Sequence, residues 1–296
     1  MPNFVFFGSP NFAATILETL MDQTWRPTLV VTEPPKPTGR GNNLRLTAVH
    51  ILADSAKISV ATPATTPELL SVLEGQRSDF FLVAAYGKIL PQSVLDLPRY
   101  GAINIHASLL PAYRGASPVQ AVISKGETRT GITFMLMEAG LDTGPILQSF
   151  PVAIQPNDTT SSLTDRLAQI AAQTVIPTLR NFLTHKIMPQ PQEEARASTT
   201  RKLTKENGEI RLTAISPRQL DRRIRAYTPW PGVYTLEFGK RLKILEGRLE
   251  RVWYCITELQ WAGKTAIDGK SFALAYPNIL TKLPKTIKLG ASFKKR

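Results

Sequence analysis

Short, almost entirely apolar runs alternate with amphipathic stretches over the first 150 residues of the chain. The apolar runs are rich in Phe, Val, Ile and Leu, which is typical of strands that are buried on both faces of a sheet. They lie at residues 4–7, 29–32, 80–84 and 102–106. Between them, apolar positions at helical spacing predict helices over residues 11–21, 48–56 and 68–73. Strands that alternate with helices indicate a doubly wound α/β domain with a mostly parallel sheet.

The pattern changes beyond this region. Residues 130–137 and 146–154 are predicted to form a pair of strands joined by a loop. A longer helical pattern begins at Ser161, and Pro177 is expected to kink or divide that helix. Pro, Gln, Thr and charged residues then dominate residues 188–205, which is typical of a linker.

Strand-like segments return after this linker and predict a small β domain. They lie at residues 233–238, 242–245 and 253–256. The whole chain, with 296 residues and 43% apolar content, is longer than one typical domain of ~100–200 residues. We therefore expect a larger domain over residues 1–187, a linker over 188–205 and a second, smaller domain over 206–296.

The positive charge of the chain is confined to its last third. Residues 1–200 hold 15 Lys and Arg against 15 Asp and Glu, whereas residues 201–296 hold 21 against 8 and so account for the whole net charge of +13. A small domain with this much charge repels itself, and a polyanion such as nucleic acid relieves the repulsion. The alternative is a solvated, solubilising surface. A membrane-surface role is disfavoured because the cations do not line one face of a helix.

Several features argue against other classes. The single cysteine, Cys255, excludes a disulfide within the chain, and no apolar run approaches the ~18 residues that would span a membrane. The first residues, MPNFVFFGSP, have no basic segment ahead of the apolar ones, so we interpret them as a strand and not as a signal peptide. We expect a soluble, cytoplasmic protein. The turn after this strand holds only Gly8, which disfavours a nicotinamide cofactor, and the few scattered His residues disfavour a metal site.

Asn104 and His106 place an amide and an imidazole in the otherwise apolar stretch INIHASLLPAYRG. Two residues apart in a strand, both side chains emerge on one face, and burying them without partners would cost ~1–3 kcal/mol each. A core histidine bonded to backbone is the ordinary interpretation. His106, however, ends its apolar run, where α/β folds place ligand chemistry.

Asp142, in the loop GLDTG, can complete this set. An amide donor stabilises an oxyanion, while an imidazole and a carboxylate manage charge and protons, so the three groups together suit acyl transfer. No serine stands in a nucleophile elbow, and we expect direct attack by the nucleophile of the substrate. The 36 residues between His106 and Asp142 do not by themselves establish contact.

The segments INIHASLLPAYRGASPVQ and TGITFMLMEAGLDTGPIL resemble the 10-formyltetrahydrofolate-dependent formyltransferases. FGSPNFA, PKPTGRG, AAYGKILP and RAYTPWPGV fall in the order of that family, and the resemblance covers most of residues 1–247. The fuller match is to members that formylate methionyl-tRNA for translation initiation. The resemblance implies a Rossmann-like formyltransferase domain, a small tRNA-binding β-barrel domain and 10-formyltetrahydrofolate as co-substrate. We expect a monomer that binds no metal and acts on the initiator methionyl-tRNA.

Carried over residue by residue, the catalytic trio of the family corresponds to Asn104, His106 and Asp142. Asn104 and His106 would stabilise the oxyanion, and Asp142 would hold the imidazole and help to remove the amine proton. Two segments correspond to the folate-binding residues of the family. They are Ser108, Leu109, Leu110 and Pro111, and Tyr86, Gly87, Lys88, Ile89 and Leu90. Taken singly, Ile89, Leu109 and Leu110 could equally be core residues.

The loop EPPKPTGRGNNLRL corresponds to an insertion with which the family grips the acceptor end of tRNA. We expect Pro and Gly to keep it out of regular structure while Lys36, Arg40 and Arg45 present cations to phosphates. The family usually has lysines where this chain has Asn42 and Asn43, so we expect weaker and less salt-sensitive binding.

Basic residues of the linker and of the second domain are further candidates for phosphate contacts. They are Arg201, Lys202 and Lys205, and Arg222, Arg223 and Arg225. The last three could equally be solvent-exposed charges on a helix. We expect Trp230, between two prolines, to be a packing anchor and not a platform for base stacking.

Two other functions remain open at this point. A formyltransferase for a sugar-nucleotide amine or for glycinamide ribonucleotide would share the trio, but a small nucleotide needs neither the cationic loop nor the charge of +13. An RNA-binding protein with an inactive core would have no need of the trio.

Overall fold

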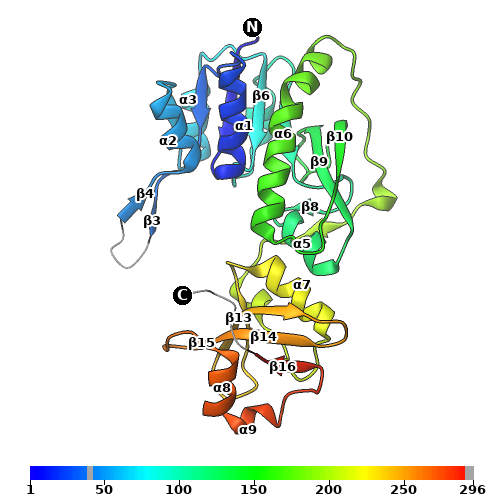
Figure 1. Cartoon of the computed structure of the whole chain (residues 1–296). Helices are drawn as coiled ribbons and strands as arrows, with labels where there is room; N and C mark the ends of the chain where they lie inside the picture. Colours follow the sequence, from blue (N-terminus) through cyan, green and yellow to red (C-terminus); the bar gives the residue numbers. More distant parts are fainter. Residues whose placement is uncertain (39–42, 291–296) are drawn as a thin grey trace. The chain divides into compact units, whose positions relative to one another are not determined.

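The computed structural model describes residues 1–38 and 43–290 of the chain. The chain forms two compact units that interleave along the sequence, and each is described by itself (Figure 1). The first unit comprises Met1–Gly115, Arg129–Ala153 and Thr164–Thr199, and the second comprises Ala116–Thr128, Ile154–Leu163 and Thr200–Arg296. The contiguous domain limits expected at residues 187 and 205 stay a prediction.

A seven-stranded sheet forms the centre of the first unit. Its order is β10 (Ile146–Ala153), β9 (Arg129–Leu136), β7 (Ala102–His106), β6 (Phe80–Ala84), β1 (Phe4–Gly8), β2 (Leu29–Val31) and β5 (Val60–Ala61). The strands from β7 to β5 are parallel, and β9 runs antiparallel to both β7 and β10. The predicted mostly parallel sheet, and the predicted pair of strands beside it, are confirmed.

Helices cover both faces of this sheet because its strands are apolar on both sides. The helices of the first unit are α1 (Asn11–Asp22), α2 (Ala48–Ser55), α3 (Thr66–Leu73), α4 (Gln92–Leu95) and most of α6 (Thr160–Leu183). α3 and α4 pack their buried leucines against Val5, Phe7 and Phe81 on one face. α1 and α6 lie over the opposite face (Figure 1). This is the predicted doubly wound architecture. Within the described part of the chain, no helix is long and apolar enough to cross a membrane.

Helix α6 runs unbroken through Pro177, so the expectation that this proline would divide it is wrong. An interior proline removes one backbone hydrogen bond and costs ~3 kcal/mol. Val175 and Leu179, on either side of it, are fully buried. The packing of the apolar face of α6, on both sides of the proline, offsets that cost.

The loop after β2 contains a hairpin, which the sequence did not predict. Its strands are β3 (Lys36–Thr38) and β4 (Asn43–Arg45), paired antiparallel. The expectation that Pro and Gly would keep this segment out of regular structure is therefore wrong. An isolated two-stranded ribbon has only edge strands, and an edge strand tolerates a proline such as Pro37.

The second unit contains a separate sheet and several helices. The sheet has the order β12 (Val233–Thr235), β13 (Leu242–Leu249), β14 (Tyr254–Trp261) and β15 (Ile267–Asp268), and β16 (Ile287–Leu289) pairs with β14. The helices are α5 (Pro118–Lys125), α7 (Pro217–Tyr227), α8 (Gly269–Ala275) and α9 (Pro277–Leu280). The predicted β domain is confirmed, but these strand pairings do not establish a closed barrel.

Short elements lie along the segment that the sequence predicts to be a linker. They are η1 (Glu194–Arg196), β11 (Thr199–Thr200) and η2 (Lys205–Gly208). β11 pairs with β8 (Arg114–Gly115), which follows the polar end of β7. The backbone N–H of Arg114 donates to the carbonyl oxygen of Ser198 at 2.8 Å. Part of this segment is therefore bonded to the first unit.

Candidate active site

The carboxyl ends of β6 and β7 lie side by side, because Val83 pairs with Asn104 in parallel register. Each strand leads into one of the segments expected to bind folate. β6 is followed by Tyr86 to Leu90, and β7 ends at His106 and is followed by Ser108 to Pro111. Both predicted segments therefore begin at the same edge of the sheet, where α/β folds bind ligands.

The side chains of Asn104, His106 and Asp142 meet at this edge. Asn104 Nδ2 donates to Asp142 Oδ1 at 3.3 Å, and His106 Nδ1 lies 3.6 Å from Asp142 Oδ2. The imidazole is 8% exposed and the carboxylate 12% exposed. A charged group this deeply buried needs partners, and the amide and the ring provide two of them. The contact between His106 and Asp142, which their separation in the sequence did not establish, is thus present in the structure.

A backbone amide is the third partner of the carboxylate. The N–H of Gly115 donates to Asp142 Oδ2 at 2.7 Å, a short distance typical of a hydrogen bond to a charged acceptor. Sequence reasoning did not find this donor, because backbone groups leave no signal in the residue types.

The loop of Asp142 has an unusual backbone. Asp142 itself has a positive φ of 54°, in the left-handed region that disfavours residues with a side chain. A glycine is required at position 144, because a Cβ there would lie 2.0 Å from the carbonyl oxygen of Leu136. At Gly140 a Cβ would instead meet the side-chain hydroxyl of Thr143 at 2.1 Å. The loop therefore packs against the backbone of β9 through Gly144.

The residues after β7 hold the His106 ring from its other side. His106 Nε2 lies 3.0 Å from the carbonyl oxygen of Tyr113, and because a carbonyl only accepts, this nitrogen carries the proton of that bond. Ser108 donates from its hydroxyl to the carbonyl oxygen of Ala112 at 2.7 Å, which closes the turn. Thr133 on β9 donates to the carbonyl oxygen of Ser108 and accepts from the N–H of Leu110.

Comparison with known proteins identifies the family. Residues 2–179 match the Formyl transferase family, and residues 202–252 match the Formyl transferase, C-terminal domain, family. The chain belongs to the formyl transferase family.

Relatives and solved structures agree with this assignment. A methionyl-tRNA formyltransferase of Geobacter sulfurreducens is 42% identical over 242 residues, which cover 81% of this chain and 76% of that one. The solved methionyl-tRNA formyltransferase from Clostridium thermocellum has a TM-score of 0.60 at 17% identity and covers 91% of this formyltransferase and 100% of its own chain. An N-formyltransferase from Helicobacter canadensis, solved with folinic acid and dTDP-3-aminofucose, has a TM-score of 0.65 at 19% identity over 86% of this chain and 90% of that one. At these identities the two structures support the fold alone.

The segment after β6 mixes core and exposed residues. Tyr86 and Leu90 are buried in the core beside α3 and α4. Ile89 is 84% exposed, so the alternative that Ile89 is a core residue is wrong. The ammonium of Lys88 donates to the carbonyl oxygens of Pro63 and Ala64 at 2.6 and 3.1 Å. Burial, and then the negative charge of Glu33, raise the pKa of Tyr86 to about 12, so its phenol stays neutral.

The segment after β7 is the more enclosed of the two. Ser108 is fully buried, Leu110 is buried in the core, and Leu109 and Pro111 are partly buried. Ser108 to Pro111 are therefore fixed in place by packing, and their contact with folate stays a prediction.

The cations expected to contact tRNA have different surroundings. The ammonium nitrogen Nζ of Lys36 lies 2.6 Å from Oε1 of Glu33 in an ion pair, and Arg45 is exposed. Arg40 and Asn42 lie outside the described residues. The second-unit candidates Arg201, Lys202 and Lys205 are all exposed.

Three arginines of α7 make bonds that stabilise the second unit. Arg222 donates to the carbonyl oxygen of Lys125, Arg223 to that of Glu209, and Arg225 to that of Asp158. Their guanidinium groups are therefore partly used in packing. Trp230 is 50% exposed, which does not support the packing role expected for it.

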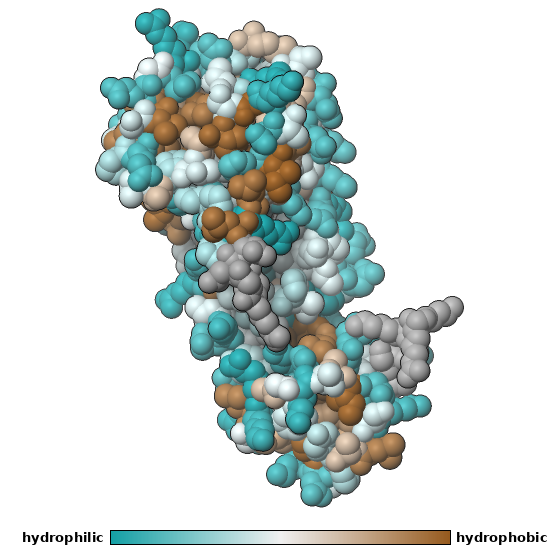
Figure 2. Space-filling model, turned by 90° about the vertical axis from the view of Figure 1, so that its left-hand side faces the viewer, coloured by the Kyte–Doolittle hydropathy of each residue, from teal (hydrophilic) through white to brown (hydrophobic). Residues whose placement is uncertain are grey.

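Exposed apolar side chains occur near the hairpin. Figure 2 shows apolar residues gathered on the side of the first unit that carries the hairpin and α2. Leu44, Ile51 and Ile89 are among the exposed large apolar residues of this unit.

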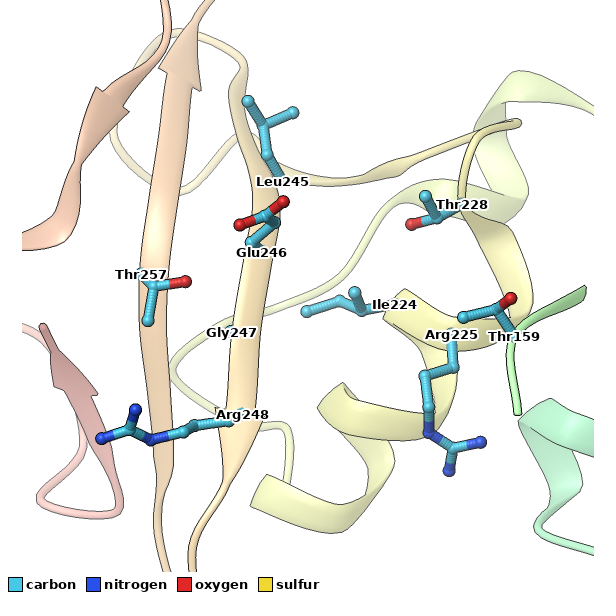
Figure 3. Close-up of a pocket in the computed structure, with 9 residues that line it drawn as sticks. All are labelled: Thr159, Ile224, Arg225, Thr228, Leu245, Glu246, Gly247, Arg248 and Thr257. Atoms are coloured by element: carbon cyan, nitrogen blue, oxygen red, sulfur yellow. The ribbon is translucent and has the colours of Figure 1, made fainter. Parts of the chain in front are cut away.

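The second unit has an open cavity of about 330 Å³ between α7 and β13 (Figure 3). Residues with hydroxyl and charged side chains form part of its lining, among them Thr159, Thr257 and Arg225. None of the residues predicted to be catalytic or folate-binding lines it. Among the residues that the structure describes, no group of three or more His, Cys, Asp and Glu could hold a metal ion.

Two alanine substitutions test how the loop of Asp142 is fixed. Gly144→Ala should lower the free energy of unfolding by about 1–3 kcal/mol, because its Cβ meets a backbone oxygen that cannot rotate away. Gly140→Ala is the matched control, and it should cost less because the Thr143 hydroxyl can rotate. Urea denaturation of both variants measures the difference. A loss for Gly140→Ala as large as that for Gly144→Ala would contradict this description of the loop.

Proposed function

We propose that this formyltransferase transfers the formyl group of 10-formyltetrahydrofolate to the α-amine of methionyl-tRNA and so produces formylmethionyl-tRNA for translation initiation. The convergence of Asn104, His106 and Asp142 carries the proposal, because it places an amide donor, an imidazole and a carboxylate around one point. The 42% identity to a methionyl-tRNA formyltransferase supports the choice of acceptor.

The reaction needs three things from the protein. The α-amine attacks the formyl carbon, a C–N bond forms, and negative charge develops on the formyl oxygen. The amine must then lose a proton, and the bond from the formyl carbon to N10 of the folate must break. Asn104 and His106 suit the first of these demands, and Asp142 suits the second. The proton that leaves the attacking amine passes to N10 as the bond from the formyl carbon to N10 breaks, so the folate leaves as a neutral amine.

Asn104 serves the developing negative charge. Its amide nitrogen has two N–H groups, and while one donates to Asp142 Oδ1 the second can donate to the formyl oxygen. His106 adds a ring that, when protonated, places a positive charge beside the same oxygen. Asp142 accepts the proton of the amine, directly or through a water, and orients the imidazole.

The residues of the two folate segments fit a flat, largely apolar ring. Ile89 presents an exposed apolar side chain, Gly87 adopts a positive φ of 87°, and the partly buried Leu109 follows the catalytic strand. When bound, 10-formyltetrahydrofolate supplies the formyl group. Tyr86, Lys88, Leu90, Ser108 and Pro111 position these segments through their backbone and packing.

The acceptor end of tRNA is expected to lie against the loop after β2. Lys36 and Arg45 face each other across the hairpin, since they are register partners, and both side chains are exposed. Arg201, Lys202 and Lys205 add positive charge at the start of the second unit. We further propose that the chain is a cytoplasmic monomer, that its second domain completes the β-barrel of the family, and that the limits at residues 187 and 205 separate its domains.

A sugar-nucleotide amine is the second candidate acceptor, because the Helicobacter canadensis enzyme of similar fold was solved with such a compound. The net charge of +13, concentrated in the last third, favours tRNA over so small a substrate.

A formyl-transfer assay tests the choice of acceptor. With labelled 10-formyltetrahydrofolate, kcat/KM should be about 100-fold or more higher for methionyl-tRNA than for free methionine or an amino sugar nucleotide, because only tRNA uses the basic surface. A preference for the sugar nucleotide would overturn the assignment.

Arg45→Ala tests the role of the hairpin. The loss of one phosphate contact should raise KM for methionyl-tRNA about threefold or more and reduce the salt slope of log kcat/KM by about 1, with KM for the folate unchanged. Arg77→Ala is the matched control, because Arg77 is exposed at the opposite end of the strands, ahead of β6. An equal loss in the use of folate and of tRNA would count against this role.

A further inference from the structure

Gln192 lies in the segment predicted to be a linker, yet its side chain is bonded to the loop that carries Asp142. Its amide nitrogen Nε2 donates to the carbonyl oxygens of Asp142 and Gly144, at 2.8 and 2.7 Å. One amide therefore ties together both ends of a three-residue turn. The reaction assigned above makes no use of Gln192.

Arg114 determines which end of the Gln192 amide faces this turn. Its Nε donates to Gln192 Oε1 at 3.1 Å, and since a guanidinium has only donors, the amide oxygen must face Arg114 and the NH₂ group must face the turn. The Arg114 side chain is buried, at 5% exposed. The orientation of the amide thus follows from a fixed neighbour.

Glu194 holds Arg114 in place from the solvent side. Both terminal nitrogens of the guanidinium donate to the carboxylate, at 3.0 and 2.8 Å, in a bidentate pair. The hydrogen bond from Arg114 lowers the pKa of Glu194, so this carboxylate is charged at neutral pH. Glu194, Arg114 and Gln192 form a chain of hydrogen bonds that ends at the backbone of Asp142.

The same two neighbouring residues hold Asp142 at two points. The N–H of Gly115 donates to the carboxylate of Asp142, and the side chain of Arg114 reaches its carbonyl oxygen through Gln192. This matters because Asp142 has a φ of 54°, which a residue with a side chain keeps only where its surroundings hold it there.

We propose that Gln192 is a positioning residue that keeps Asp142 in this left-handed conformation, so that the carboxylate meets Asn104 and His106. The inference rests on the proposed function, because it assigns Gln192 to the same reaction. Gln192 acts through Asp142 and needs no contact with either substrate.

A change of Gln192 to glutamate separates two possible roles of the side chain. Glutamate has the same shape and still accepts from Arg114, so it would preserve a purely structural link between the segment and the first unit. It cannot donate, however, and it places an oxygen against the carbonyl oxygens of Asp142 and Gly144. The substitution therefore removes only the hydrogen bonds that the side chain donates to the carbonyl oxygens of Asp142 and Gly144.

The first experiment measures steady-state kinetics of the full chain with methionyl-tRNA and 10-formyltetrahydrofolate. Gln192→Glu and Gln192→Ala should each lower kcat about 10- to 100-fold and leave both KM values within about twofold, because only the alignment of Asp142 is disturbed. Gln190→Ala is the matched control, since this exposed side chain of the same segment donates to the carbonyl oxygen of Met188. It should keep the wild-type kcat. A wild-type kcat for Gln192→Glu would overturn the proposal.

A double-mutant cycle tests whether Gln192 acts through Asp142. In an Asp142→Asn background, Gln192→Glu should cost less than about threefold in kcat, because the group that it positions is already lost. An undiminished 10- to 100-fold loss would show a separate structural effect and would contradict the proposal.

A structure of Gln192→Glu gives a readout that does not depend on activity. The carboxylate of Asp142 should leave the N–H of Gly115, and an unchanged Asp142 would overturn the inference. If the wild-type chain formylates no methionyl-tRNA but Asp142 moves as described, the proposed function fails and the positioning role of Gln192 stands.

Discussion

The carboxylate of Asp142 is the point on which the site depends, because three groups from two segments of the first unit donate to it or face it. Asn104 and His106 come from the end of a buried strand, and Gly115 donates through its backbone. A buried carboxylate without these partners would be costly. The residue that carries the charge also has a strained backbone, so the surrounding fold must supply the stability that its own conformation lacks.

The parallel sheet explains why these groups can meet. Parallel strands end at the same edge, so the segments after β6 and β7 begin beside one another at the polar end of β7. β9, antiparallel to β7, supplies Thr133 beneath the turn of Ser108 and leads into the loop of Asp142. Apolar packing on both faces of the sheet fixes the strands, and the strands in turn position the polar residues.

Much of this could be predicted from the sequence, because the relevant signals are local. The apolar runs located the strands, and the two polar residues at the end of one of them pointed to the edge of the sheet where Asn104, His106 and Asp142 converge. The hairpin after β2 was missed because two short strands with a proline carry almost no periodic signal. Gln192 was missed because its segment is rich in Pro and Gln, a composition that describes a linker and says nothing of long-range hydrogen bonds. The division of α6 at Pro177 was wrongly expected because tertiary packing outweighs a local preference.

The removal of the negative charge of Asp142 tests the central claim most directly. Asp142→Asn keeps the shape of the side chain but cannot accept the proton of the attacking amine, so at saturating methionyl-tRNA and 10-formyltetrahydrofolate the turnover rate should fall by about 100-fold or more, with folate affinity preserved. A variant that turns over at nearly the wild-type rate would contradict the account, because the carboxylate would then have no part in the chemistry.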